Sequence, residues 1–204
     1  MRDLTHVSIV IAALALAGCA SPPAKLVVLP APSSMATVPQ ETSGSNILLR
    51  SVTVPGYLET FPVVTGRTNG ALVVSDSTEW AERFSDGVTR VLRDALARRV
   101  GAERVLIARD GRIPDADLTI EFLSLDPVAG MLNLDARWFF ACAVRAQSRG
   151  GRTHLEVPVA RPTPEAVADA TTAALTRLAD ELATQMPCAE QPQRHAIRAK
   201  GEAP

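Results

Sequence analysis

The segment from Leu132 to Val144 alternates apolar and polar side chains, and this alternation is the strongest constraint on how the chain can fold. Successive side chains of a β-strand point to opposite faces of its sheet, so the pattern predicts a strand with one buried and one solvated face. The apolar parity holds Leu132, Leu134, Ala136, Trp138, Phe140, Cys142 and Val144, and the polar parity holds Asn133, Asp135, Arg137 and Arg145. A sheet built around this strand needs a second layer to cover its apolar face.

Other apolar or alternating runs predict further strands. They are Lys25–Leu29, Ile47–Val54, Val63–Thr68, Ala71–Ser75, Val105–Ala108, Leu118–Phe122 and Thr153–Val159. Asn69-Gly70 predicts a tight hairpin between two of these strands, because both central positions of such a turn favour positive φ. Gly150-Gly151 predicts a turn that leads into the last strand.

Two segments with apolar residues at helical spacing are expected to supply the second layer. The first helix is predicted to begin at Asp76, with Glu79 completing a capping box, and to end at Gly101. Its apolar stripe is Trp80, Phe84, Val88, Val91, Leu92, Ala95 and Leu96. The second helix is predicted to begin at Thr163-Pro164-Glu165 and to end at Pro187. Its apolar stripe is Val167, Ala170, Ala174, Leu178 and Leu182.

These patterns together predict an α+β fold class. Each helix has one apolar stripe, so each is expected to pack on one face of the sheet. The expected architecture is a two-layer sandwich, in which two amphipathic helices cover one face of a mixed or antiparallel sheet. Hydrophobic residues make up 47% of the chain but aromatic residues only 4%, which predicts a mostly aliphatic core.

The N-terminal segment has the layout of a bacterial lipoprotein signal. An apolar run from Val7 to Ala17 is shorter than the roughly 20 residues of a membrane-spanning helix, and it leads into Leu16-Ala17-Gly18-Cys19. In this interpretation residues 1–18 are removed and Cys19 becomes the first residue, with covalent acyl chains and no other cofactor. An ordinary secretory signal with a chance cysteine, or a buried apolar strand, is the alternative.

The signal also predicts how the rest of the chain is organised. Residues 19–24 would be a lipidated tether, residues 25–188 a single domain, and residues 189–204 a polar, disordered tail. Ala20 follows the cysteine, whereas an aspartate at this position marks retention at the inner membrane in enteric-type sorting. The expected location is therefore the periplasmic face of the outer membrane.

Charge and motifs argue against several function classes. The formal net charge is -1 without a basic patch, which argues against a nucleic-acid partner. The sequence has no serine-nucleophile elbow, glycine-rich phosphate loop or HExxH zinc motif. His154 and His195 are isolated, so we expect neither catalytic residues nor a metal site. Asp115 and Asp117 precede a strand and are expected to form a turn.

Cys142 and Cys188 remain once Cys19 is assigned to the lipid anchor. An oxidising periplasm permits a disulfide between them, which would join a strand to the end of the last helix. Two unpaired thiols are the alternative, because pairing geometry cannot be obtained from a sequence.

Several short segments follow one another in an order and spacing typical of one family. They are Val54-Pro55-Gly56-Tyr57-Leu58, Val63-Val64-Thr65, Trp80-Ala81-Glu82-Arg83-Phe84, Val88-Thr89-Arg90-Val91-Leu92 and Leu132-Asn133-Leu134-Asp135-Ala136-Arg137-Trp138. With the lipoprotein signal and the closing helix, the chain resembles the ABC-type transport auxiliary lipoproteins, which include the outer-membrane lipoprotein of the paraquat-inducible system. One departure is that Lys25–Leu29 lacks the aromatic residues usual in the family's first strand, which could alter partner choice.

The resemblance implies a non-enzymatic accessory subunit of an MCE-type lipid transport system, which docks the transport assembly at the outer membrane. The implied partners are an MCE-domain protein, inner-membrane transporter components and outer-membrane lipid, and a homo-oligomer is compatible with the family. The alternatives are a carrier with a lipid pocket between sheet and helices, a general envelope-assembly adaptor, and an envelope enzyme.

Two parts of the chain are candidates for the partner interface. Tyr57 and Leu58 follow a Pro-Gly break and are expected on an exposed loop, Pro55–Phe61, where apolar side chains often anchor interfaces. The alternative is that they fold back over the sheet. Asp135 and Arg137 lie on one face of the predicted strand, where a surface ion pair is the alternative to a partner contact.

Overall fold

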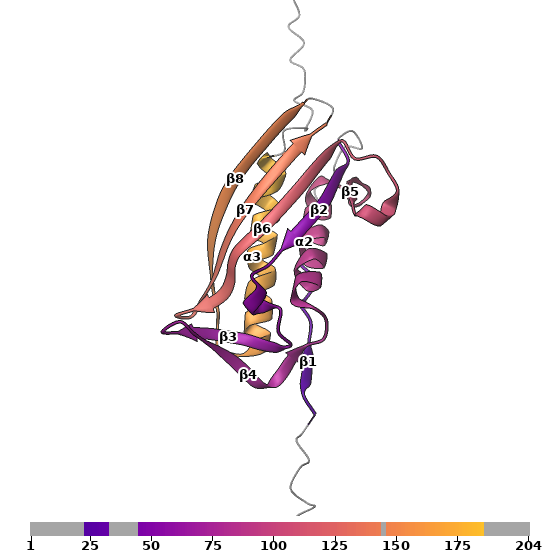
Figure 1. The fold of residues 1–204 in the computed structure, drawn as a ribbon. Coiled ribbons are helices and arrows are strands. Elements are labelled where there is room, and N and C mark those ends of the chain that lie inside the picture. Colours follow the sequence, from indigo (N-terminus) through magenta and orange to yellow (C-terminus); the bar gives the residue numbers. More distant parts are fainter. Residues whose placement is uncertain (1–22, 33–44, 144–145, 186–204) are drawn as a thin grey trace, which may run out of the picture.

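The computed structural model describes residues 23–32, 45–143 and 146–185 (Figure 1). Its elements are β1 (Lys25–Val27), β2 (Ile47–Thr53), η1 (Gly56–Leu58), β3 (Pro62–Thr68), β4 (Ala71–Trp80), α2 (Phe84–Val100), η2 (Ala102–Arg104), β5 (Val105–Leu106), η3 (Ala108–Asp110), β6 (Ala116–Val128), β7 (Met131–Cys142), β8 (Gln147–Pro158) and α3 (Pro164–Gln185). A five-stranded sheet, β5-β2-β6-β7-β8, forms one layer with α2 and α3 behind it. A three-stranded sheet, β1-β4-β3, closes one end.

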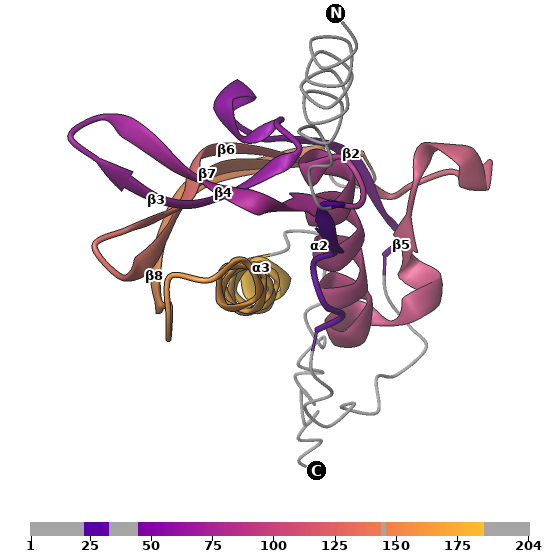
Figure 2. The same ribbon diagram turned by 90° about the horizontal axis from the view of Figure 1, so that it is seen from below.

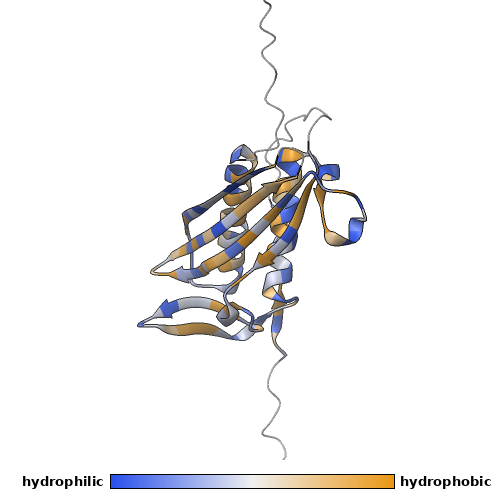
Figure 3. Ribbon diagram, turned by 45° about the horizontal axis from the view of Figure 1, so that its top comes forward, coloured by the Kyte–Doolittle hydropathy of each residue, from blue (hydrophilic) through white to orange (hydrophobic). Residues whose placement is uncertain are grey.

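The larger sheet is mixed. Strands β6, β7 and β8 pair antiparallel, whereas β2 is parallel to both β5 and β6. Figure 2 shows both helices on the same side of this sheet, and Figure 3 shows hydrophobic and hydrophilic residues interspersed along its strands. The expectation of an α+β fold, with two helices on one face of a mixed sheet, is confirmed.

Strand β7 carries the alternation that the sequence predicts. Leu132, Leu134 and Phe140 are completely buried, whereas Arg137 and Phe139 on the opposite parity are exposed. Removing apolar surface from water contributes about 25 cal/mol per Å², so the buried parity holds the sheet against the helices. The opposite parity forms the outer face of the sheet.

The predicted hairpin at Asn69-Gly70 is present between β3 and β4. Asn69 has a φ of 50° and Gly70 a φ of 82°, as a two-residue hairpin turn requires. Thr68 pairs with Ala71 across this turn. The preference of asparagine and glycine for positive φ therefore accounts for the position of this turn.

The predicted start of the first helix at Asp76 is wrong, because both Asp76 and Glu79 lie in β4. The strand continues to Trp80, which is paired with Val27 of β1 and donates its backbone N–H to the carbonyl oxygen of Phe61 at 2.7 Å. The helix begins only at Phe84, whose ring centroid lies 5.2 Å from that of Trp80. Pairing with distant strands outweighs the local capping pattern.

The predicted turn at Gly150-Gly151 is also wrong, because both glycines lie within β8. They stand opposite Phe139 and Trp138 in the register with β7. A Cβ on Gly151 would lie 2.4 Å from the indole Cζ2 of Trp138. Glycine in a strand interior often marks such a close approach, and here it makes room for the tryptophan ring.

The end of α2 and the start of α3 lie where the sequence predicts them. Gly101, with a φ of 100°, ends α2 and donates its N–H to the carbonyl oxygen of Ala97 at 2.9 Å. Helix α3 begins at Pro164, and Pro187 lies outside the described residues. Arg99 of α2 and Asp180 of α3 form an ion pair between the helices. Within the described ranges, no helix has the length and apolar character needed to cross a membrane.

Candidate partner-binding surface

Tyr57 and Leu58 lie in η1, between β2 and β3. Leu58 is only 4% exposed, and its N–H donates to the carbonyl oxygen of Pro55 at 2.9 Å. Tyr57 is half-buried and packs against the core. The expectation that both side chains are exposed on a loop is therefore wrong. The alternative is correct, because both side chains fold back onto the body of the domain. Phe61, at the end of the same loop, is the exposed apolar residue, at 63%.

The Tyr57 side chain belongs to a polar cluster with Arg67 of β3 and Asp126 of β6, named here the Tyr57 cluster. The phenol donates to Oδ1 of Asp126 at 2.6 Å, and Nη2 of Arg67 lies 3.1 Å from Oδ2 of the same carboxylate. The guanidinium carbon lies 4.7 Å from the centroid of the Tyr57 ring. Asp126 is 1% exposed, and a carboxylate buried to this degree needs such partners.

The cluster changes the acidity of the phenol. Burial, followed by the hydrogen bond to Asp126 and the charge of that carboxylate, raises the pKa of Tyr57 to about 12, while Arg67 lowers it. The contacts join three elements that are far apart in the sequence. The cluster thus fastens η1 and the β3–β4 hairpin to the end of β6, and we assign it a structural role.

Asp135 and Arg137 lie on the outer face of β7, as the parity of the strand predicts. Each binds a neighbouring strand. Asp135 accepts a hydrogen bond from Nε of Arg152 at 2.7 Å and a second one from Nη2 of the same side chain. Nη1 of Arg137 lies 3.7 Å from Oε2 of Glu121 in β6. The hydrogen bond from Arg152 is the main cause that lowers the pKa of Asp135.

These side chains extend into a wider surface, named here the outer charged face. It consists of Glu121, Asp135, Arg137, Arg152, His154 and Glu156. Glu121, Arg137 and Arg152 stand in one row across β6, β7 and β8, and Asp135 stands opposite His154 in the next. The expectation of an exposed strand histidine holds for His154, whose side chain is 60% exposed.

Phe139 is an exposed aromatic residue on the same face, which the sequence interpretation did not single out. It is 49% exposed, and its ring lies against Gly150, where a Cβ would stand 3.3 Å from Cδ2 of the ring. The signal was present in the sequence, because residue 139 has the parity of Asp135 and Arg137. Aromatic residues and arginine are enriched at protein interfaces, and Phe139 lies on the same face as Arg137 and Arg152.

The Tyr57 cluster and the outer charged face lie on the same side of the sheet. Asp126 pairs with Asn133, which has the parity of Asp135 two residues further along β7. The structure thus brings the two predicted parts of the interface onto one face, with η1 at its end. Tyr57 and Leu58 support this face, and Asp135 and Arg137 form part of it.

A cavity of about 450 Å³ lies beside this region, at the start of α2. It is lined by Glu59, Thr60, Phe61, Glu82, Arg83 and Phe84. Sites for apolar ligands are lined mainly by apolar side chains, whereas four of the six residues that line this cavity are polar or charged. The space between the sheet and the helices is filled by core side chains, including Leu118, Ile120 and Leu178, which have no exposed surface. These features do not favour an acyl-chain carrier.

The remaining candidate residues have structural contacts. The expectation that Asp115 and Asp117 form a turn is wrong for Asp117, because β6 begins at Ala116 and includes it. Oδ2 of Asp115 accepts the N–H of Asn46 at 2.7 Å, and Oδ2 of Asp117 accepts a hydrogen bond from Nη2 of Arg50 at 2.6 Å. Among the residues that the structure describes, no group of three or more His, Cys, Asp or Glu side chains is placed to hold a metal.

The cysteines are only partly within the described structure. Cys142 is 3% exposed at the end of β7 and is bonded in a disulfide. Cys188 lies outside the described residues, so its pairing with Cys142 stays a prediction. Cys19 and His195, the signal segment 1–18 and the tail 189–204 lie outside as well. The lipid anchor and the domain limits therefore also remain predictions.

Comparison with known proteins shows the family. Residues 28–183 match the family described as ABC-type transport auxiliary lipoprotein component. A crystal structure of an uncharacterized protein superposes with a TM-score of 0.63 at 15% identity, covering 80% of this chain and 99% of that chain. Protein XCC0632 from Xanthomonas campestris, of family DUF330, superposes with a TM-score of 0.62 at 17% identity, covering 78% of this chain and 93% of that chain. No curated protein matches. The two structures share the fold, and the family match establishes that this chain belongs to the ABC-type transport auxiliary lipoproteins.

Proposed function

We propose that the protein is a lipid-anchored, non-enzymatic subunit that docks an MCE-type lipid transport assembly at the outer membrane. The family match over residues 28–183 carries this proposal, because the family is an auxiliary lipoprotein component of ABC-type transport. An auxiliary component acts through contacts with its transporter and therefore needs an accessible surface. The proposed partners are an MCE-domain protein and, through it, the inner-membrane transporter components.

The outer charged face is the proposed binding surface for the MCE-domain protein. It carries carboxylates and guanidinium groups at fixed positions, so it would fit a partner surface with complementary charges. Phe139 supplies an exposed aromatic side chain next to these charges, and aromatic residues with arginine are the side chains that most often dominate binding energy. The face lies opposite the helices and is formed by three long strands, which keep it rigid.

The acyl group on Cys19 is the proposed reason for the location. One acyl chain gives only reversible membrane binding, and stable anchoring needs a second signal or a second chain. A multiply acylated cysteine meets this requirement. Ala20 directly after Cys19 favours transfer to the outer membrane over retention at the inner one.

The test is a crosslinked pull-down of the full acylated chain from bacterial membranes, read by mass spectrometry. We expect an MCE-domain protein in the wild-type sample and its loss with Cys19→Ala, which removes the anchor. A double variant, Arg137→Glu with Phe139→Ala, is expected to lower recovery severalfold while the protein stays in the membrane. Arg98→Glu is the matched control, because Arg98 is exposed on α2, on the other side of the sheet.

Two results would contradict the proposal in different ways. Equal recovery from the double variant and from the Arg98→Glu control would remove the outer charged face as the binding surface. Recovery of peptidoglycan-associated or envelope-assembly proteins in place of an MCE-domain protein would replace docking by a general adaptor function.

A further inference from the structure

Exposed aliphatic side chains gather on the three-stranded sheet that closes one end of the molecule. Leu26 of β1 is 62% exposed, and Leu72, Val73 and Val74 of β4 are 36%, 46% and 42% exposed. We name these four residues the apolar hairpin end. Leu72, Val73 and Val74 lie at the start of β4, in the part of the β3–β4 hairpin that projects beyond the body of the molecule in Figures 1 and 2, and Leu26 lies beside the other end of β4, opposite Glu79.

The hairpin around Leu72, Val73 and Val74 carries little charge, and the first charged residues of β4 are Asp76 and Glu79, further along the strand. The sequence from Thr68 to Ser75 has no charged residue. The nearest charged side chain in β3, Arg67, is neutralised by Asp126, and Lys25 is neutralised by Glu165 at 2.6 Å. Proteins that expose a strand to water usually protect it with charges, especially lysine. Residues 68–75 lack this protection, so the exposed aliphatic side chains of the hairpin are open to contact with another apolar phase.

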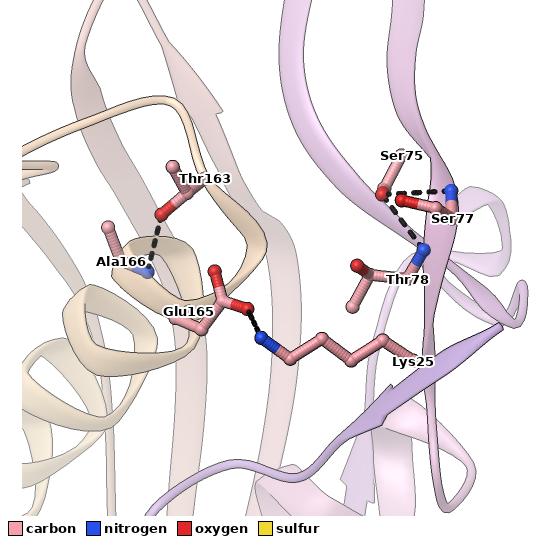
Figure 4. A network of polar contacts seen from close by, with 7 residues as sticks. All are labelled: Lys25, Ser75, Ser77, Thr78, Thr163, Glu165 and Ala166. Atoms are coloured by element: carbon pink, nitrogen blue, oxygen red, sulfur yellow. Dashed lines mark hydrogen bonds and ion pairs between the residues drawn. The ribbon is translucent and has the colours of Figure 1, made fainter.

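The first described strand belongs to the same three-stranded sheet and lies beside the other end of β4. Strand β1 is paired with β4, Lys25 standing opposite Thr78, and the Lys25–Glu165 ion pair fastens it to the first turn of α3 (Figure 4). Cys19 precedes Lys25 by six residues, and a fully extended chain spans at most about 3.6 Å per residue. An acyl group on Cys19 would therefore hold Lys25 within about 20 Å of the membrane surface.

We propose that the apolar hairpin end is a second membrane contact, whose aliphatic side chains enter the interfacial region of the bilayer that holds the acyl chains. This inference rests on the lipid anchor in the proposed function. Interfacial segments place their apolar side about 5–10 Å into the boundary between headgroups and acyl chains. The tether keeps the hairpin near the surface, so a weak intrinsic affinity is sufficient.

The contact also sets the orientation of the molecule. In Figure 1 the long strands of the larger sheet extend from the hairpin end towards the opposite end, where β5 lies. With the hairpin on the membrane, these strands point away from it. The outer charged face then stands at the side of the molecule, accessible to a partner that approaches across the periplasm.

Fluorescence quenching by brominated phospholipids tests this contact in the full acylated chain. The variant Val73→Trp places an indole on the hairpin, and Leu72→Trp repeats the test if the first variant folds poorly. Trp80 and Trp138 are only 5% and 7% exposed and contribute a protected background. Ile113→Trp is the matched control, because Ile113 is 88% exposed in the connection between β5 and β6, at the opposite end.

We expect a severalfold greater loss of fluorescence for Val73→Trp than for Ile113→Trp when the vesicles contain brominated lipid. Equal quenching of the two variants overturns the membrane contact. Intact-mass analysis and vesicle flotation test the anchor separately. Protein without acyl chains that fails to float contradicts the proposed function, whereas acylated protein that floats without quenching at position 73 contradicts only the hairpin contact.

Hydrogen exchange distinguishes the bilayer from a second copy of the chain. We expect the amides of Leu72, Val73 and Val74 to exchange severalfold more slowly when the acylated protein is bound to vesicles than in the soluble Cys19→Ala chain at the same concentration. Equal protection in both samples would mean that protein, and not lipid, covers the hairpin, and would overturn the inference.

Discussion

The indole ring of Trp138 occupies the space in which a side chain at Gly151 would stand. A Cβ built there would lie 2.4 Å from Cζ2 and 2.8 Å from Cε2 of the ring. The two residues face each other in the register of β7 and β8, and Nε1 of Trp138 donates to Oγ1 of Thr153 at 3.2 Å. On the outer face, Phe139 lies against Gly150 in the same way but with more room. The two glycines thus seat one aromatic ring on each side of the sheet.

Gly151→Ala is expected to destabilise the protein by about 1–3 kcal/mol, the usual cost of overpacking a core. The buried ring of Trp138 would have to move to admit the methyl group. Gly150→Ala is the comparison, because its Cβ would lie 3.3 Å from the half-exposed ring of Phe139 and 3.3 Å from the backbone oxygen of Trp138, a milder contact than the one at Gly151. Urea unfolding of both variants measures the difference. Equal losses would show that the Trp138 contact is not the cause.

Leu58→Ala is expected to lower the free energy of unfolding by about 2–5 kcal/mol, because it leaves a cavity where a 4%-exposed side chain was. Phe61→Ala, in the same loop, removes a 63%-exposed ring and is expected to change stability by less than about 0.5 kcal/mol. Thermal or urea unfolding compares them. Near-equal, small effects would restore the interpretation of the whole loop as an exposed interface element.

Tyr57 is the only tyrosine of the chain, so phenolate absorbance during an alkaline titration reports on this residue alone. We expect the pKa of Tyr57 to be about 12 in the folded protein and near the ordinary tyrosine value of 10.0 in urea. The folded state holds the phenolic proton more tightly, so the stability from this group is complete below pH 10 and is lost as the pH rises towards 12.

The Tyr57→Phe variant provides the control for this titration. It removes the phenolate signal together with the part of the alkaline loss of stability that depends on the hydrogen bond to Asp126. A folded-state midpoint near 10 in the wild type would contradict the buried Tyr57 cluster.

Cys188→Ser is expected to lower the free energy of unfolding by about 2–4 kcal/mol in oxidising conditions, because a disulfide to Cys142 restricts the unfolded chain. With reductant, wild type and variant should unfold alike. Thiol labelling of the unfolded protein before and after reduction checks the bond directly. Labelling of Cys188 in the wild type without reductant would contradict its pairing with Cys142.

Parity and turn chemistry made much of the fold predictable. The alternation in β7 placed Asp135 and Arg137 on the solvated face, and Asn69-Gly70 placed the hairpin, because both signals depend on neighbouring residues only. The start of α2 was not predictable in this way. Asp76 and Glu79 satisfy a capping pattern, yet the pairing of Trp80 with Val27 extends β4 through them.

The candidate site was predictable to a smaller extent. Parity alone could have added Phe139 to the outer face. The ion pairs of Asp135 with Arg152 and of Arg137 with Glu121 depend on strand register, which long-range pairing sets. Leu58 follows a Pro-Gly break, which suggests an exposed loop. In the structure η1 instead folds back onto the body, where the Tyr57 hydroxyl donates a hydrogen bond to the buried carboxylate of Asp126.

The sequence by itself determined the α+β class, the buried and solvated faces of β7, the hairpin turn and the resemblance to a lipoprotein family, because each is encoded in local periodicity or a short motif. Only the tertiary structure decided where α2 begins, why Gly150 and Gly151 lie within a strand, and which charges meet on the outer face. The same holds for the exposure of the aliphatic residues Leu72, Val73 and Val74 in β4. These features arise where segments distant in the chain come into contact, and at Asp76–Glu79 such contacts outweigh the local capping pattern.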